Sequence, residues 1–300
     1  MKNTPAHVAS VPIVGRWTGQ IGDYIELTKP RLNVLVVATS AAGYYLGTSS
    51  TPRLLAMVQA VCGTALVAGG AAVLNQVYER DTDALMRRTR TRPLPDGRIA
   101  VGDARLFGLA LALGGLILLG VAANLLAALL ALITLVTYLI VYTPMKRRSA
   151  AATLVGAIPG ALPPLIGWTA ASGGLSLGGW SLFAIVFLWQ IPHFMAIAWL
   201  FRDDYGKAGF PMLPVIEPDG VRTGRQALLY AACLVPVSLL PSLAGTSGVV
   251  YLWSALGLGL ALAGLAARFA AHRTEGAARA LFFGSIVYLP LIWAVMVVDH

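Results

Sequence analysis

Three oxygen-bearing side chains recur four residues apart at the end of a long apolar segment. They are Asn75, Glu79 and Asp83. Residues four apart lie on one face of a helix, so a helix here would carry these side chains as one polar stripe. Mg²⁺ prefers oxygen ligands and usually shares itself with substrate phosphates. The spacing therefore predicts a magnesium site, made by Asn75, Glu79 and Asp83, that holds a diphosphate.

An arginine cluster follows the stripe and runs up to Pro93. Its members are Arg80, Arg87, Arg88, Arg90 and Arg92. A guanidinium pairs with phosphate oxygens through two parallel hydrogen bonds. A charged loop beside a membrane segment is common, but such loops rarely place an asparagine and two acids at strict four-residue spacing. We therefore expect arginines such as Arg87 and Arg88 to pair with the phosphate oxygens of a bound diphosphate.

A second basic cluster occurs in Tyr142-Thr-Pro-Met-Lys146-Arg147-Arg148. Three cations in one short turn can serve membrane topology alone. The alternative is a second set of phosphate partners, Lys146 and Arg147, with Tyr142 at the edge of a cavity.

A third cluster joins a histidine inside an apolar segment to a charged stretch. Pro192 and His193 precede Arg202-Asp203-Asp204-Tyr205-Gly-Lys207. An ionisable residue inside a membrane is a functional candidate by default. Four roles stay open for His193: a structural hydrogen bond, contact with an aromatic acceptor, a base and a metal ligand.

A proline-rich stretch also lies inside an apolar segment. Pro159, Pro163 and Pro164 stand in Gly156–Trp168. We expect these prolines to break the helix. The small residues between them serve either helix packing or the lining of a cavity for an apolar substrate.

The composition indicates an integral membrane protein. The 300 residues are 57% hydrophobic and 12% charged, with a mean hydropathy of +0.74, whereas soluble domains carry about 25% charged residues. The net charge of +9 reflects topology rather than nucleic-acid binding. We expect an all-α bundle of nine transmembrane helices around a central cavity, with cytoplasmic cap loops. The predicted spans are 32–49, 54–77, 105–122, 125–143, 151–171, 179–201, 225–243, 248–270 and 280–298.

The charges lie almost entirely on one side of these predicted spans. Of 22 Lys and Arg, only Arg53 falls on the other side, and 12 of 13 acids share the basic side. The positive-inside rule places that side, with the N-terminus and the expected active site, in the cytoplasm, and the C-terminus outside. Residues 1–300 form one domain in this interpretation, with residues 1–22 as a flexible N-terminal segment.

Taken together, the motifs resemble the haem O synthase family, within the superfamily of membrane-embedded aromatic (UbiA) prenyltransferases. The matching pieces are Glu26–Arg31, Asn75–Pro95, Tyr142–Arg148, Gly156–Leu165 and Pro192–Pro214. The resemblance spans about residues 22–298. Two departures stand out. Glu79 replaces the usual middle aspartate of the first motif, and the adjacent pair Asp203-Asp204 replaces two aspartates spaced by four.

The resemblance implies a reaction and a set of ligands. Farnesyl diphosphate and haem B are the implied substrates, Mg²⁺ the cofactor, and haem O and diphosphate the products, with water added at the haem vinyl group. The reaction would be a step of haem A biosynthesis in the cell inner membrane, and a haem A synthase is a candidate partner that receives the product. Haem-binding candidates are His193, Arg202, Asp203, Asp204, Lys207 and Lys29, where Asp204 is also a candidate metal ligand and His193 a candidate iron ligand.

Three other functions remain open from the sequence. A prenyltransferase of the same kind could act on a quinone precursor or a chlorin. A transporter would place ionisable residues near the bilayer midplane, whereas nearly all acids here lie at one edge. A non-enzymatic assembly factor for a haem protein would not need the carboxylate stripe.

Overall fold

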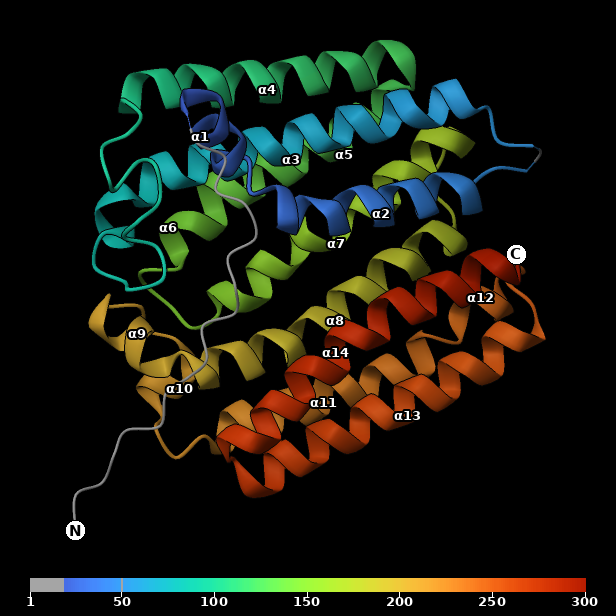
Figure 1. Ribbon diagram of the computed structural model, residues 1–300. Coiled ribbons are helices and arrows are strands. Elements are labelled where there is room, and N and C mark those ends of the chain that lie inside the picture. The colour runs from blue at the N-terminus through green and yellow to red at the C-terminus, as the bar shows by residue number, and fades with distance from the viewer. Residues whose placement is uncertain (1–18, 50) are drawn as a thin grey trace.

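The computed structural model describes residues 19–49 and 51–300, and these form helices and connecting loops without a β-strand. The predicted all-α fold is confirmed (Figure 1). The elements are α1 Gln20–Leu27, α2 Pro30–Leu46, α3 Leu54–Asp83, α4 Val101–Ala122, α5 Leu125–Val136, a π-helical turn at Thr137–Tyr142, α6 Thr143–Met145, α7 Ala152–Ser172, α8 Leu177–Leu200, α9 Arg202–Lys207, α10 Leu213–Ile216, α11 Val221–Val237, α12 Leu240–Leu243, α13 Val249–His272 and α14 Glu275–Val298.

Within the described ranges, eight helical stretches are long and apolar enough to cross a membrane. The protein is therefore a multi-pass membrane protein. The predicted count of nine is not confirmed, because the segment expected at 32–49 forms α2, which has only 17 residues. Proline suits the first position of a helix, since it has no N–H to donate, and Pro30 begins α2 in this way.

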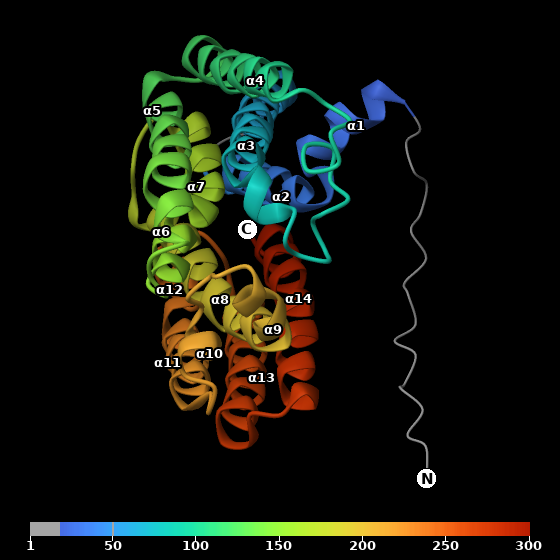
Figure 2. The same cartoon turned by 90° about the vertical axis from the view of Figure 1, so that its left-hand side faces the viewer.

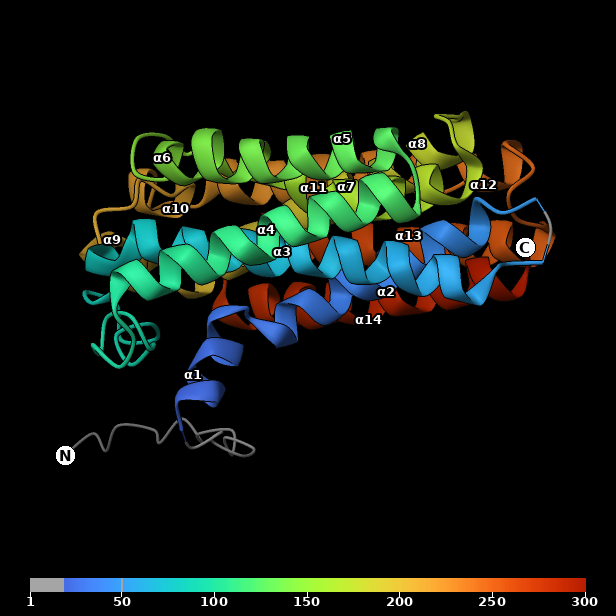
Figure 3. The same cartoon turned by 90° about the horizontal axis from the view of Figure 1, so that it is seen from above.

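The long helices run side by side, so the bundle has two distinct ends (Figures 1 and 3). The longest, α3, packs between α4 and α2, while α8 packs against α7, α11 and α14. Figure 2 shows this packing along the helix axes. Apolar side chains such as Leu106, Leu113 and Ile117 on α4 are exposed, as expected for a surface that meets lipid.

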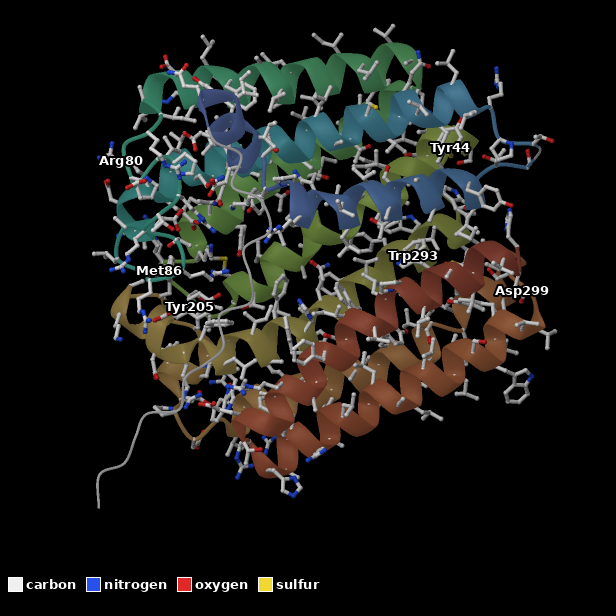
Figure 4. The ribbon with its side chains drawn as sticks, in the orientation of Figure 1. Tyr44, Arg80, Met86, Tyr205, Trp293 and Asp299 are labelled. Atoms are coloured by element: carbon white, nitrogen blue, oxygen red, sulfur yellow. The ribbon has the colours of Figure 1, made fainter. Side chains whose placement is uncertain are left out.

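The polar loops gather at one end of the bundle. In Figure 4, Arg80, Met86 and Tyr205 lie at that end, and Tyr44 and Asp299 lie at the other. The helices α9 and α10 and the loop 84–100 also belong to the first end (Figure 1). The sidedness of charge in the sequence therefore corresponds to two chemically different ends of the fold.

The prolines of α7 do not break the helix, so that prediction was wrong. Pro159, Pro163 and Pro164 all lie inside the continuous helix Ala152–Ser172. Membrane helices tolerate proline because neighbouring groups compensate the lost hydrogen bonds. Here α7 packs tightly against α2. A Cβ atom at Gly167 would lie 1.9 Å from the Ser40 carbonyl oxygen, so only glycine permits this approach.

The predicted flexible segment 1–22 lies mostly outside the described residues. Its last residues, from Gln20, belong to α1.

Candidate functional site

A cavity of about 430 Å³ lies between α2, α3, α5, the π-helical turn, α7 and α8. Its polar lining gathers toward the end of the bundle that carries the charged loops. The charged side chains in this lining are Lys29, Glu79, Asp83, Arg88, Arg92 and Lys146. Toward the other end the lining turns apolar, with Val67, Ala68 and Ala71 on α3 and Ile166 on α7. The cavity thus has the character of a site for a ligand with a charged head and an apolar body.

The predicted polar stripe is present on α3. Asn75, Glu79 and Asp83 all lie within this helix, face the cavity and are at most 4% exposed. Burying carboxylates is costly unless cations or hydrogen bonds compensate them. The stripe therefore requires partners, and the structure provides them from distant segments.

A cation contacts each carboxylate of the stripe. The Lys146 ammonium lies 3.1 and 3.2 Å from the two Glu79 carboxylate oxygens. Arg92 Nη1 lies 2.6 Å from Asp83 Oδ2. Thr89 also donates its hydroxyl to the Asp83 carbonyl, which fixes the loop that carries Arg92. Both carboxylates are thereby held in place.

The amide of Asn75 has a defined orientation. Its oxygen accepts a hydrogen bond from Lys29 Nζ at 3.3 Å, and its nitrogen donates to Thr143 Oγ1 at 3.1 Å. The Thr143 hydroxyl in turn donates a hydrogen bond to the Tyr138 carbonyl oxygen at 2.7 Å. The amide oxygen consequently faces Lys29, a third cation of the cavity lining.

The cations at this end of the cavity influence one another. Burial, together with the charges of Arg92 and Lys146, lowers the pKa of Lys29 to about 7. Burial also disfavours charge on Lys146, but Tyr142 and the Glu79 carboxylate outweigh it and raise the pKa of Lys146 above its ordinary value. Lys29 also has a φ of 51°, a left-handed conformation that is rare for residues other than glycine. Such strain is typical of functional sites.

The donor set of the stripe fits Mg²⁺. Two carboxylates and an amide oxygen on one helix face are hard oxygen donors, the type that this ion prefers. Within the described residues no three His, Cys, Asp or Glu form a metal cluster of their own. A metal bound here would therefore take further oxygens from a ligand, as Mg²⁺ does when it binds phosphates.

Aromatic rings surround the same cations. Lys146 Nζ lies 5.5 Å from the ring centre of Tyr142 and 5.4 Å from that of Phe210. Arg88 lies 5.8 Å from the ring centre of Phe201. Tyr142 ends a π-helical turn, a local widening that often occurs at functional sites. Tyr142 is also one of the residues that line the cavity.

His193 lies in α8 and contributes to the cavity wall. Its Nδ1 atom is 2.8 Å from Ser285 Oγ on α14. The imidazole stacks on Trp189 and on Phe282, with ring centres 5.0 and 5.1 Å away. This histidine is thus fixed in an aromatic pocket at the wall of the cavity.

Six of the residues expected in the site do not line the cavity. They are Arg87, Arg147, Arg202, Asp203, Asp204 and Lys207. The Arg202 guanidinium lies 4.9 Å from the Trp199 ring centre and 3.7 Å from Glu275, an arrangement that directs it toward α14. Their assignment to haem, metal or diphosphate stays a prediction.

Three further residues near the stripe were not selected as site residues from the sequence. Arg92, Tyr138 and Thr143 all touch the stripe or its partners. Arg92 had been grouped with the arginine cluster, but nothing in its spacing distinguishes it from its neighbours. Tyr138 stands four residues before Tyr142, one helical turn away, and that spacing could have indicated it.

Comparison with known proteins identifies the family. The model of the UbiA prenyltransferase family matches residues 36–287. The chain belongs to the UbiA prenyltransferase family. Several relatives within it carry the name protoheme IX farnesyltransferase. The protein of that name from Solibacter usitatus is 48% identical, over 93% of this chain and 98% of its own length. The one from Myxococcus xanthus is 42% identical and covers 98% of both chains.

Solved structures of UbiA proteins share the fold. A structure described as a digeranylgeranylglyceryl phosphate synthase matches with a TM-score of 0.80 at 18% identity, over 93% of this chain and 98% of that one. A UbiA homologue from Archaeoglobus fulgidus, bound to GPP and Mg²⁺, matches with a TM-score of 0.67 at 18% identity, over 91% and 99%. The resemblance to the prenyltransferase superfamily inferred from the motifs is confirmed.

Proposed function

We propose that this protein transfers the farnesyl group of farnesyl diphosphate to a vinyl group of haem B, with addition of water, to give haem O and diphosphate. Relatives that are 41–48% identical and match over nearly their whole length carry the name protoheme IX farnesyltransferase. The reaction would supply a haem A synthase, a candidate partner.

One observation carries the proposal. The α3 stripe of Asn75, Glu79 and Asp83 faces buried cations at the head of a cavity whose remaining wall is apolar. A diphosphate requires the head, and an isoprenoid chain requires the apolar wall. A simple inorganic ion has no apolar part and would not require the apolar wall. The geometry therefore favours a transferase over an ion transporter.

The residues that would hold Mg²⁺ are Asn75, Glu79 and Asp83, with Asp204 retained as a further candidate. When bound, Mg²⁺ would supply positive charge that stabilises the departing diphosphate. Lys29, Arg92 and Lys146 surround the same position and would bind the remaining phosphate charge. Arg87, Arg88 and Arg147 lie nearby in sequence and are proposed as outer partners.

The chemical step is an allylic substitution. The C–O bond between farnesyl and diphosphate breaks, and the electron pair leaves with the oxygen. The haem vinyl group supplies the electron pair for the new C–C bond. Water then adds its oxygen to the cationic carbon next to the porphyrin and releases a proton. The apolar wall formed by Val67, Ala68 and Ala71 keeps water from the allylic carbon before the vinyl group reacts.

The arrangement in the membrane follows from the charge distribution. We propose that the end with the charged loops faces the cytoplasm in the cell inner membrane, and that the C-terminus lies outside. We also propose that α2 crosses the bilayer as the ninth span, because it packs along α7 and α3 and carries cavity residues. The helices would then surround the cavity.

A quinone precursor or a chlorin is the second candidate acceptor. Trp189 and Phe282 stack on His193, and of these three rings only His193 lines the cavity, where it can contact any flat conjugated acceptor. Histidine is also an established iron ligand, which favours the iron porphyrin.

The test combines turnover with a matched pair of variants. Purified protein is incubated with haem B, farnesyl diphosphate and Mg²⁺, and the product is identified by mass. Haem O is expected from the parent protein and from the control variant Asp96→Ala, because the Asp96 side chain lies in the neighbouring loop and is 53% exposed. Asp83→Ala should insert in the membrane normally and form no haem O. Prenylation of a quinone precursor or a chlorin with no reaction of haem would reject the haem assignment.

A further inference from the structure

Ser285 is a buried residue of α14 that directly contacts a cavity residue, His193. The two lie 92 positions apart in sequence, and their contact joins α8 to α14. The Ser285 hydroxyl lies 2.8 Å from His193 Nδ1 and 2.6 Å from the Phe282 carbonyl oxygen. A hydroxyl has one hydrogen to donate, while a carbonyl can only accept. The Ser285 hydrogen therefore goes to Phe282, and the Ser285 oxygen is left to accept a hydrogen from His193.

This pair of contacts fixes the tautomer of the imidazole. Nδ1 must carry the hydrogen, because otherwise its lone pair would face a lone pair of the Ser285 oxygen. In the neutral ring, Nε2 then holds a lone pair. Across residues 19–49 and 51–300, no hydrogen bond engages Nε2. Trp189 and Phe282 stack on the ring at interplanar angles of 19° and 24°, so an edge of the ring remains for a ligand.

We propose that Ser285 is a positioning residue that holds His193 as the Nδ1–H tautomer, so that Nε2 presents its lone pair in the cavity as a ligand for the iron of a porphyrin. The inference rests on the proposed function for the identity of that acceptor. Histidines that bind metals almost always donate their other ring N–H to a fixed acceptor, as His193 does here.

The surroundings distinguish an iron ligand from a general base. A histidine base gains a proton, and a carboxylate usually stabilises the resulting cation. The acceptor at Nδ1 here is a neutral hydroxyl, and no ion pair of His193 with an acid is found in the described part of the chain. The environment therefore suits a ring that stays neutral and donates its lone pair.

The backbone around Ser285 allows a clean variant. The Ser285 carbonyl accepts a hydrogen bond from Trp189 Nε1 at 2.8 Å, independently of the side chain. Ser285→Ala removes only the hydroxyl, so the link between Trp189 and α14 is kept. Ser285→Thr keeps a hydroxyl that can bond back to the helix.

The first measurement is the ring ¹⁵N spectrum of the full chain labelled at histidine, recorded without and then with haem B. His193→Gln assigns the signals, and His272→Gln, which removes an exposed imidazole, is the control. The expected spectrum shows a protonated Nδ1 and an unprotonated Nε2, and haem B shifts the Nε2 signal. A protonated Nε2 in the free protein, or an Nε2 signal that saturating haem B leaves unchanged, would overturn the proposal.

The second measurement is haem B affinity by absorption titration. Ser285→Ala removes one hydrogen bond, the one that Ser285 makes with His193. We expect this loss to weaken haem B binding about three- to tenfold. His193→Ala should weaken binding further and change the spectrum of the bound haem, and added imidazole should restore that spectrum. Ser285→Thr should lie closer to the parent. Farnesyl diphosphate affinity should not change in any of these variants, which shows that they are folded. An unaltered haem spectrum in folded His193→Ala would also reject the assignment.

The two proposals fail in different ways. If haem O forms but Nε2 carries the hydrogen, only the role of Ser285 and His193 is wrong. If the spectra agree with the tautomer and with iron ligation but no haem O forms, the reaction assignment is wrong.

Discussion

Replacement of Arg92 by methionine tests whether the buried carboxylates of the stripe depend on cations from outside α3. Arg92 contacts Asp83 at 2.6 Å, and the Asp83 side chain is 2% exposed, while that of Arg92 is 23% exposed. Breaking a buried ion pair by removing one partner costs about 3–5 kcal/mol. Because water reaches Arg92 in part, we expect the lower limit, about 3 kcal/mol.

The assay is thermal unfolding in detergent, with a matched arginine as control. A loss of about 3 kcal/mol corresponds to a decrease in Tm of about 5 °C for 300 residues. Arg222→Met breaks an ion pair with Glu217 whose side chains are 60% and 28% exposed, so it should cost less than about 1 kcal/mol. Equal decreases in Tm for the two variants would refute the reasoning.

Magnesium provides an internal check on the same variant. Arg92 and a metal cation would compete for the Asp83 carboxylate, so Mg²⁺ should raise the Tm of Arg92→Met more than that of the parent. In the double variant Arg92→Met/Asp83→Asn this additional gain should disappear. If the double variant keeps the gain, the metal binds elsewhere.

Three further predictions follow from the site and the packing. Removal of divalent cations with EDTA should stop prenyl transfer, and added Mg²⁺ should restore it; turnover without metal would contradict the diphosphate chemistry. Lys146→Met should lower turnover by about tenfold or more, because a cation that contacts Glu79 at 3.1 Å is lost from the head of the cavity. Arg148→Met should have little effect. The measurement is steady-state kinetics with haem B, and equal losses for the two variants would contradict the reasoning. Gly167→Ala should destabilise the protein by about 1–3 kcal/mol, because the added Cβ would lie 1.9 Å from the Ser40 carbonyl oxygen. Gly114→Ala is the control, since a Cβ there meets nothing within 4 Å. Similar Tm values for the two variants would argue against close packing of α2 on α7.

The stripe could be predicted because it depends only on local geometry. Four-residue spacing on a helix fixes a common face, whatever the rest of the chain does. The partners of the stripe could not be predicted in the same way. Lys146 lies 67 positions from Glu79, and only the packing of the π-helical turn against α3 brings them together. The contact of His193 with Ser285 is another such case.

Local rules also failed where tertiary packing dominates. Three prolines in α7 predicted a broken helix, but α7 continues between α2 and α8. The span expected at 32–49 is present but shifted toward the N-terminus as α2, Pro30–Leu46, because proline suits the first position of a helix. The second acidic pair, Asp203 and Asp204, lies on the short helix α9, outside the cavity lining. Its position depends on how the loop folds over the bundle, which residue spacing does not encode.

The central claim is that the α3 stripe binds a metal diphosphate. The most direct test is an experimental structure with a non-hydrolysable farnesyl diphosphate analogue and Mn²⁺, located by its anomalous scattering. The metal peak is expected against Asn75, Glu79 and Asp83, with the phosphates beside Lys29, Arg92 and Lys146. A metal and phosphates at the opposite end of the bundle, near α12 and Asp299, would contradict the account.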